Sequence, residues 1–282
     1  MAEEHHCGGS GEGCTGNCEN CKQKKENEEC RIQEGLNRIK RKIVVLSGKG
    51  GVGKSTVAVN LAFALAATGA NVGLMDVDIH GPSVPKMLHL EGMKLMSDGE
   101  KITPVEIGNL KVVSLAFLLQ NPDDAIIWRG PVKLGVIRQF FSDVNWGDLD
   151  YLVVDTPPGT GDEPLTVCQL LHDAEAVIVT TPQEVSASDV RKSISFCRQL
   201  KMNILGIVEN MSGFVCPHCG KVTEIFAGNA GRKLAEQYAV PFLGRLPIDP
   251  AVSAGGDAGS PFARQNETAS AQSFAEIIKV IG

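Results

Sequence analysis

The sequence predicts an α/β protein built on a doubly wound, mostly parallel sheet. Short runs of Val, Ile and Leu recur after residue 43 and alternate with longer helical stretches. The runs are continuously apolar, which is typical of strands buried on both faces of a sheet. Helices between successive strands indicate right-handed βαβ units. In addition, a glycine-rich loop follows the first run, at a position where such folds bind phosphate.

Seven segments have the length and composition of strands, and each is bounded by glycine, proline or polar residues. They are Ile43–Ser47, Val72–Asp76, Leu110–Leu115, Tyr151–Asp155, Ala176–Thr180, Ile204–Glu209 and Phe242–Arg245. A helix is expected at Thr56–Thr68, with Gly69 just past its end. Ligands in such sheets bind beyond the carboxyl ends of the strands, so the residues at those ends are the candidate site residues.

The bulk properties exclude several classes of function. The chain has 282 residues, a net charge of −6 and 5% aromatic residues, and its pI is about 5.6. Nucleic-acid-binding domains usually show a basic patch, with a pI above about 9, or aromatic platforms. No apolar run approaches the roughly 20 residues of a membrane span, and the N-terminus is unlike a signal peptide. We therefore expect a cytoplasmic protein that binds neither nucleic acid nor membrane.

The loop after the first strand matches the pattern G-x-x-x-x-G-K-[ST]. Backbone N–H groups of such a loop converge on phosphate oxygens, Lys54 can reach the β/γ phosphates, and Ser55 can hold Mg²⁺. The helix that starts here adds its positive dipole end. The sequence therefore predicts an ATP·Mg²⁺ site. The predicted ATP-binding residues of this loop are Gly48, Lys49, Gly50, Gly51, Val52, Gly53, Lys54, Ser55 and Thr56.

Acidic residues follow two of the predicted strands. Asp155 ends an apolar run and precedes a glycine-rich loop, so we expect it to hold Mg²⁺ together with Ser55, most simply through water. Asp78 lies just beyond its own strand and is free to orient or deprotonate an attacking water. The alternative for each is an acid that caps the following helix. Lys49, Lys54 and Asp78 are the predicted catalytic residues.

Domain organisation follows from composition. Residues 1–42 are predicted to be a cysteine-rich, largely disordered tail followed by a basic linker or short helix that ends at Arg38-Ile-Lys-Arg-Lys42. Residues 43–282 are predicted to be one P-loop ATPase domain.

The nine cysteines point to metal or redox chemistry, because a cytosolic chain seldom keeps disulfides. Cys216 and Cys219 have the C-x2-C spacing that lets two thiolates meet one metal or cluster. Two cysteines cannot complete a tetrahedral site, so a two-fold axis between protomers would have to supply the other two. A structural zinc, or a pair without metal, remains an alternative.

The resemblance to a known family rests on five segments. Residues 48–56, Gly-Lys-Gly-Gly-Val-Gly-Lys-Ser-Thr, resemble the deviant Walker A signature of the MinD/ParA/nitrogenase iron-protein group. Four further segments resemble its Mrp/Nbp35 branch, also called ApbC. They are Asp76-Val-Asp-Ile-His-Gly-Pro-Ser83, Trp128-Arg-Gly-Pro131, Asp155-Thr-Pro-Pro-Gly-Thr-Gly-Asp-Glu163, and Glu209-Asn-Met-Ser212 followed by Cys216-Pro-His-Cys219.

This resemblance implies a homodimer in which Lys49 reaches across to the partner's ATP, and it implies that Asn210 contacts adenine. It also implies a [4Fe–4S] cluster that bridges the dimer through Cys216 and Cys219. The expected function is an ATPase that binds a cluster and transfers it to apo iron–sulfur proteins. ATP, Mg²⁺ and the cluster are the expected cofactors.

Nbp35-type members of this branch carry a second, N-terminal cluster, and here the chain departs from their pattern. Its tail has Cys14-x3-Cys18-x2-Cys21, with Cys7 before and Cys30 after. Because a cluster needs four ligands, we expect Cys14, Cys18 and Cys21 together with Cys30 or Cys7. A zinc-binding or redox-active tail is the alternative.

Two other functions compete with cluster transfer. The first is a zinc-stabilised, MinD/ParA-like dimeric switch ATPase. Such switches need a membrane helix or a basic surface, and the C-terminal segment Ala271–Ile281 is short and carries one Lys and one Glu. The second is an electron-donating reductase like the nitrogenase iron protein. The predicted switch loop Thr156–Asp162 contains no cysteine, which counts against it.

Overall fold

A computed structural model describes residues 28–78, 81–119, 128–216, 218–264 and 268–282. The expected tail ligands Cys7, Cys14, Cys18 and Cys21 lie outside the described residues. Of the tail cysteines, Cys30 is described, and it is exposed on a helix formed by residues 28–36.

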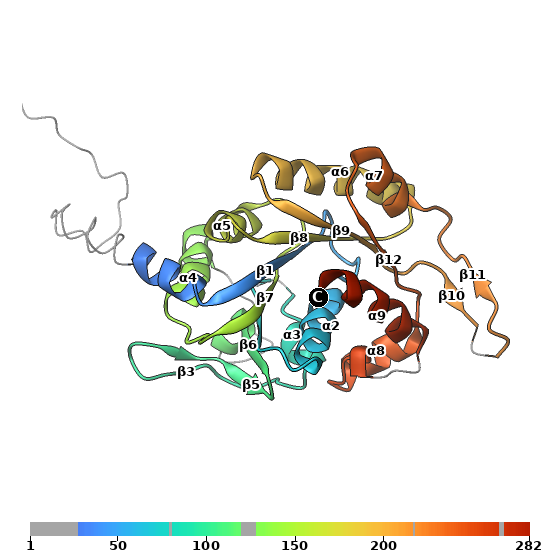
Figure 1. Cartoon of the computed structure of the whole chain (residues 1–282). Coiled ribbons are helices and arrows are strands. Elements are labelled where there is room, and N and C mark those ends of the chain that lie inside the picture. Colours follow the sequence, from blue (N-terminus) through green and yellow to red (C-terminus); the bar gives the residue numbers. More distant parts are fainter. Residues whose placement is uncertain (1–27, 79–80, 120–127, 217, 265–267) are drawn as a thin grey trace, which may run out of the picture.

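Among the described residues, eight strands form one central sheet (Figure 1), in the order β12-β9-β8-β1-β7-β2-β6-β5. Neighbouring strands are parallel except for the antiparallel pair β5 and β6. The chain starts the sheet at β1 and winds outward on both sides of it, so the predicted doubly wound, mostly parallel sheet is confirmed. The strands are β1 (Ile39–Leu46), β2 (Val72–Asp76), β5 (Val105–Ile107), β6 (Leu110–Ser114), β7 (Leu149–Asp155), β8 (Glu175–Thr180), β9 (Asn203–Glu209) and β12 (Phe242–Arg245).

Helices cover both faces of this sheet (Figure 1). On one face lie α2 (Lys54–Ala67), α3 (Val84–Met87), α8 (Pro250–Asp257), the 3₁₀ turn η2 (Phe262–Arg264) and α9 (Ala269–Ile281). On the other lie the helix of residues 28–36, α4 (Gly130–Ser142), α5 (Asp162–Leu170), α6 (Glu184–Gln199) and α7 (Ala230–Tyr238). A 3₁₀ turn, η1 (Leu115–Leu118), follows β6. None of the described helices is long and apolar enough to cross a membrane.

The hydrophobic core is split into two layers by the sheet. In β1, Val44 and Leu46 pack into one layer, and Ile43 and Val45 pack into the other. Successive side chains of a strand point to opposite faces. Because helices cover both faces of the sheet, all four side chains are buried. This explains the continuous apolar runs by which the strands were predicted.

The first strand begins at Ile39, four positions before the predicted start. Lys40, Arg41 and Lys42, which looked like part of a linker, are inside β1 and are paired there. Arg41 lies 2.7 Å from Glu175, and Lys42 lies 2.7 Å from Asp173. Lys42 is buried, so its charge is accommodated by a partner far away in the sequence.

The segment that carries Cys216 and Cys219 projects away from the sheet (Figure 1). It contains the short antiparallel strands β10 (Phe214–Val215) and β11 (Val222–Thr223), and it connects β9 to α7. We call residues 211–216 and 218–228 the cysteine arm. A second hairpin, β3 (Met96–Ser97) and β4 (Ile102–Thr103), lies near β5 in the chain.

Candidate nucleotide and metal sites

The loop between β1 and α2 is held in one conformation by close packing. Gly53 has φ +82°, and a Cβ added there would lie 2.2 Å from Nδ2 of Asn210. A Cβ at Gly48 would lie 2.4 Å from Cβ of Asp189. A Cβ atom would clash at both positions, and Gly53 also has a left-handed backbone, so only glycine fits at either place. The predicted glycines therefore let α6 and the end of β9 press against the loop.

Lys54 and Asp155 form a buried ion pair at the base of this loop. The Lys54 Nζ atom lies 2.5 Å from Oδ1 of Asp155 and donates a hydrogen bond to Oγ of Ser55 at 3.2 Å. Burial raises the pKa of Asp155, and the Lys54 ammonium works against that rise. The structure thus brings together the residues expected to bind phosphate and Mg²⁺.

Asp155 also has the features expected of a magnesium ligand. Among the described residues its Oδ2 atom is buried and has no hydrogen-bond partner. A carboxylate oxygen in that state suits a cation such as Mg²⁺ or one of its bound waters, since Mg²⁺ prefers oxygen ligands and keeps several waters. Ser55 is close by, because the Lys54 ammonium donates hydrogen bonds to both Ser55 Oγ and Asp155 Oδ1.

Asp76 is a buried carboxylate that sequence reasoning did not single out. It stands opposite Asp155 in the pairing of β2 with β7. Its Oδ1 accepts a hydrogen bond from the Asp78 N–H at 3.0 Å, and its Oδ2 accepts one from Ser114 Oγ at 2.9 Å. Burial and, next, the Asp155 carboxylate raise the pKa of Asp76 to about 8. Both acids end their predicted strands, and this shared position is the signal that could have revealed the pair.

The three predicted catalytic residues line one cleft of about 240 Å³. Lys49 and Lys54 come from the loop after β1, and Asp78 comes from the segment after β2. The loop after β7 is fixed against them, because Gly159 N–H donates to Ser47 O at 2.7 Å. Asp78 is buried, so its carboxylate is held in the cleft and not on open surface.

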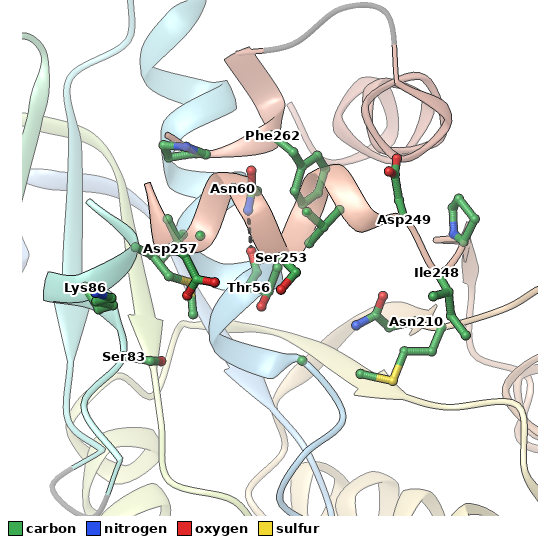
Figure 2. A pocket seen from close by; sticks show the side chains of 18 of the residues that line it. Thr56, Asn60, Ser83, Lys86, Asn210, Ile248, Asp249, Ser253, Asp257 and Phe262 are labelled. Carbon is green, nitrogen blue, oxygen red and sulfur yellow. Dashed lines mark hydrogen bonds between the residues drawn. The ribbon is translucent and has the colours of Figure 1, made fainter. Parts of the chain in front are cut away.

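A larger cavity of about 530 Å³ adjoins this cleft, and Gly53, Thr56, Ser83 and Met87 line both. Figure 2 shows Thr56 and Asn60 on one side of the cavity and Asn210, Ile248 and Asp249 on another. Asn210 Nδ2 donates to Val52 O at 2.9 Å, which ties the end of β9 to the phosphate loop. The predicted adenine contact, Asn210, therefore lines a cavity continuous with the phosphate cleft.

The cysteine arm brings Cys216 and Cys219 together at its tip. Cys216 is half-buried and Cys219 is exposed. The N–H groups of His218 and then Cys219 lower the pKa of the Cys216 thiol by hydrogen bonding. Gly220, with φ +68°, donates its N–H to Cys216 O at 2.9 Å and closes the turn. A thiol stabilised as thiolate is suited to metal binding.

Within the described residues, no group of three or more His, Cys, Asp or Glu side chains is placed to hold a metal. The cysteine pair therefore supplies two ligands of the four that a zinc site or a cluster needs. Cys168 and Cys197 are different, because burial raises the pKa of each to about 12. Both are buried in helices, α5 and α6, where a cysteine packs as a small hydrophobic residue.

The fold and the loop define a P-loop NTPase, with a glycine-rich loop after β1, an Asp at the end of the neighbouring strand β7 and an adjoining cavity of about 530 Å³. The chain belongs to the ParA family described as NUBPL iron-transfer P-loop NTPases, which matches residues 38–282.

Two curated relatives extend this finding. The iron-sulfur cluster carrier protein of Methanocaldococcus jannaschii is 48% identical over 279 residues, covering 95% of this chain and 96% of the relative. The cytosolic Fe-S cluster assembly factor Nubp2 homolog 2 of Drosophila yakuba is 56% identical over 223 residues, covering 77% of this chain and 86% of the relative.

Solved structures show the same fold. A nucleotide-binding protein from Archaeoglobus fulgidus in complex with ADP has 43% identity and a TM-score of 0.73, over 82% of this chain and 91% of the other. The cell division ATPase MinD of Pyrococcus furiosus has 25% identity and a TM-score of 0.63, over 86% of this chain and 98% of the other. The predicted membership of the MinD/ParA group is confirmed.

Proposed function

We propose that this chain is an ATP-dependent carrier that binds an iron–sulfur cluster and transfers it to apo-proteins. The observation that carries the proposal is that one chain has both a P-loop site and a cysteine pair, Cys216 and Cys219, that supplies two of the four ligands a cluster needs. The relatives named as a cluster carrier and as a cluster assembly factor support the same function. Their names favour it over a zinc-stabilised switch ATPase, which has no use for a cargo. The name of the second relative also supports a cytoplasmic location.

Two connected cavities support our proposed placement of the nucleotide. A triphosphate held by the loop at residues 48–56 would direct its ribose and base into the larger cavity, where Asn210 offers its side-chain amide. Lys54 would bind the phosphates, and Ser55 and Asp155 would hold Mg²⁺. Magnesium held there would neutralise charge on the phosphate oxygens. The Archaeoglobus relative is described in complex with ADP, which supports nucleotide binding by this chain.

Hydrolysis is assigned to Asp78 and Lys49. Asp78, fixed in the cleft through the hydrogen bond of its N–H to Asp76, would orient the attacking water. Lys49 would stabilise charge that develops on the ATP of the partner protomer, as a trans-acting cation does in other P-loop proteins. This role requires a homodimer, which we propose as the working form.

Cys216 and Cys219, with their copies in the partner, would hold a [4Fe–4S] cargo between the protomers. Exposure of the arm tip favours release of the cargo to an apo-protein. The tail residues Cys14, Cys18, Cys21 and Cys30 remain candidates for a second cluster. We propose that ATP binding and hydrolysis change the dimer geometry, and with it the spacing of the four bridging thiolates.

Anaerobic reconstitution tests this function. The chain is incubated with ferrous iron and sulfide, and iron, acid-labile sulfide, zinc and the EPR spectrum of the reduced protein are measured. We expect about four irons per dimer at the bridging site, lost in Cys216→Ala and kept in Cys197→Ser, whose cysteine is in the core. Transfer to an apo iron–sulfur protein should depend on ATP. Stoichiometric zinc without labile sulfide would contradict the proposal.

A further inference from the structure

The two ends of the cysteine arm form part of the wall of the larger cavity. Met211 lies just before β10 and Phe226 lies just after β11, and both line the cavity together with Asn210. The segment that bears Cys216 and Cys219 therefore begins and ends beside the proposed nucleoside site. A ligand in the cavity and a metal at the arm tip are linked by two short stretches of chain.

Both ends of the arm are fixed in position by the backbone. Met211 has φ +58°, a left-handed conformation that is uncommon outside glycine. Ser212 N–H, next along the chain, donates to Leu246 O at 2.8 Å. At the other end Gly228 has φ +130°, and a Cβ there would lie 2.4 Å from Pro182 O. Neither end can slide along the body of the protein without breaking these contacts.

Ile248 connects the cavity to the arm a second time. It lines the cavity next to Asn210, as Figure 2 shows. Its N–H donates to Gly213 O at 2.7 Å, and it forms a parallel bridge with Phe214 of β10. A base that displaces Ile248 would therefore move the strand that leads to Cys216.

Phe226 lines the cavity that a bound nucleotide would enter. The phosphate cleft and the larger cavity meet at Gly53 and Thr56, so a nucleotide with its phosphates on Lys54 extends from there into the cavity. Phe226 is half-exposed in the same cavity. Aromatic side chains contact nucleic-acid bases favourably whichever base is present.

We propose that Phe226 is a nucleoside-contacting residue through which nucleotide binding and metal binding at the cysteine arm influence each other. This proposal rests on the proposed function for the identity of the two ligands. The coupling is necessarily reciprocal: if a bound cluster changes the affinity for nucleotide, nucleotide changes the affinity for the cluster by the same factor.

The first experiment uses the full chain without a cluster and a fluorescent ADP analogue. Phe226→Ala should weaken binding of the analogue by about fivefold or more, which is the low end of what loss of an aromatic contact to a base costs. The matched control is Ile225→Ala, since Ile225 is its exposed neighbour on the arm and does not line the cavity. Equal affinities for Phe226→Ala and the parent chain would overturn the assignment of Phe226.

The second experiment compares the affinity for the analogue in the cluster-loaded and cluster-free parent chain. We expect a ratio of about 5 or more, as is usual for coupled sites, and a ratio near 1 in Phe226→Ala. Val252→Ala is the matched control within the cavity, because Val252 comes from α8 and not from the arm. It should weaken binding in both forms and keep the ratio. A ratio near 1 in the parent chain, or an unchanged ratio in Phe226→Ala, would overturn the coupling.

These failures differ from a failure of the proposed function. A chain that loads and transfers clusters but shows no coupling would disprove only the role of Phe226. A chain that takes up zinc and no cluster would disprove cluster transfer, and the same affinity ratio measured with zinc bound would still decide the coupling.

Discussion

Asp76 and Asp155 are paired across the neighbouring parallel strands β2 and β7, and both carboxylates are completely buried. Asp155 is neutralised by Lys54 at 2.5 Å, whereas Asp76 accepts hydrogen bonds from Ser114 and from the N–H of Asp78. Two buried acids of like charge side by side favour protonation of one of them. The ionisation of Asp76 therefore depends on the charges of Asp155 and Lys54 beside it.

The first prediction concerns stability and pH. Because burial and Asp155 raise the pKa of Asp76 from 3.8 to about 8, the folded chain holds a proton that the unfolded chain has released. The free energy of unfolding should therefore fall as pH rises between about 4 and about 8, by roughly 6 kcal/mol at most. Asp76→Asn should flatten this dependence. Urea unfolding at pH 5 and pH 8, without nucleotide or Mg²⁺, measures it.

Asp148→Asn is the control for that measurement, since Asp148 is an exposed acid near the start of β7 and its pKa is lowered by Arg38. It should leave the fall between pH 5 and pH 8 nearly unchanged. The same fall in Asp76→Asn as in the parent chain would show that Asp76 does not carry the effect.

The second prediction concerns Lys49. Lys49→Ala should bind ATP nearly as well as the parent chain and hydrolyse it about 1,000-fold more slowly, the low end for loss of a trans-acting cation. Lys54→Ala, in contrast, should bind ATP poorly because Lys54 faces both the phosphate site and Asp155. Steady-state turnover and equilibrium binding separate the two effects. Normal turnover in Lys49→Ala would remove its assigned role.

The third prediction concerns Asp78, whose side chain lines the phosphate cleft. Asp78→Asn should keep ATP binding and lose about 100-fold or more of the turnover, as expected for loss of a group that orients or deprotonates water. Mixing it with Lys49→Ala gives a sharper test. If Lys49 acts across the dimer and Asp78 within its own protomer, a mixed dimer regains one intact site. Activity that does not recover on mixing would place both residues in one protomer's site.

The fourth prediction concerns thiol reactivity. Because N–H groups of His218 and Cys219 lower the pKa of Cys216, more of it is thiolate at neutral pH. In the metal-free chain, iodoacetamide should modify Cys216 faster than the exposed Cys30 at pH 7. Burial, which raises the pKa of Cys168 and Cys197 to about 12, should protect both. Peptide mass spectrometry over a time course measures this, and slower modification of Cys216 than of Cys30 would contradict it.

The fifth prediction concerns Glu209, which is buried at the end of β9. Its carboxylate accepts hydrogen bonds from Gly231 N–H at 2.8 Å and Ser212 Oγ at 3.1 Å, and it pairs with Arg245 at 2.9 Å. Glu209→Ala should destabilise the chain by about 3 kcal/mol, because it leaves buried donors and a cation without their partner. Urea unfolding measures it; Glu184→Ala, which breaks an exposed pair with Lys233, should cost below about 1 kcal/mol.

The sequence was informative where local composition determines structure. Strands β2 and β12 have their predicted bounds, because each is a short apolar run between turn residues. Gly69 was predicted to follow the first helix, and it does so with φ +94° after Thr68. The residues of the phosphate loop were likewise predictable, since one continuous segment carries the motif.

The environments of some residues could not be predicted, because they are set by side chains far away in the sequence. Lys42 looked like part of a solvated linker because its partner, Asp173, lies far along the chain. Asp76 was passed over for the same reason, since its special state comes from Asp155 on a neighbouring strand. Strands β10 and β11 are too short for periodicity to show. The assigned roles of Lys49, Asp78 and the cysteine pair stay predictions until the experiments above are done.

The cysteine arm leaves the sheet after β9 and returns before α7 without contributing a strand to it. The eight strands of the central sheet would keep their order if the arm were removed. The arm is therefore a modular insertion. Its proposed metal-binding role could be gained, lost or exchanged in evolution while the P-loop domain and its central sheet stay the same. Grafting the arm between the corresponding elements of an arm-free ATPase with this fold is the most direct way to transplant that chemistry.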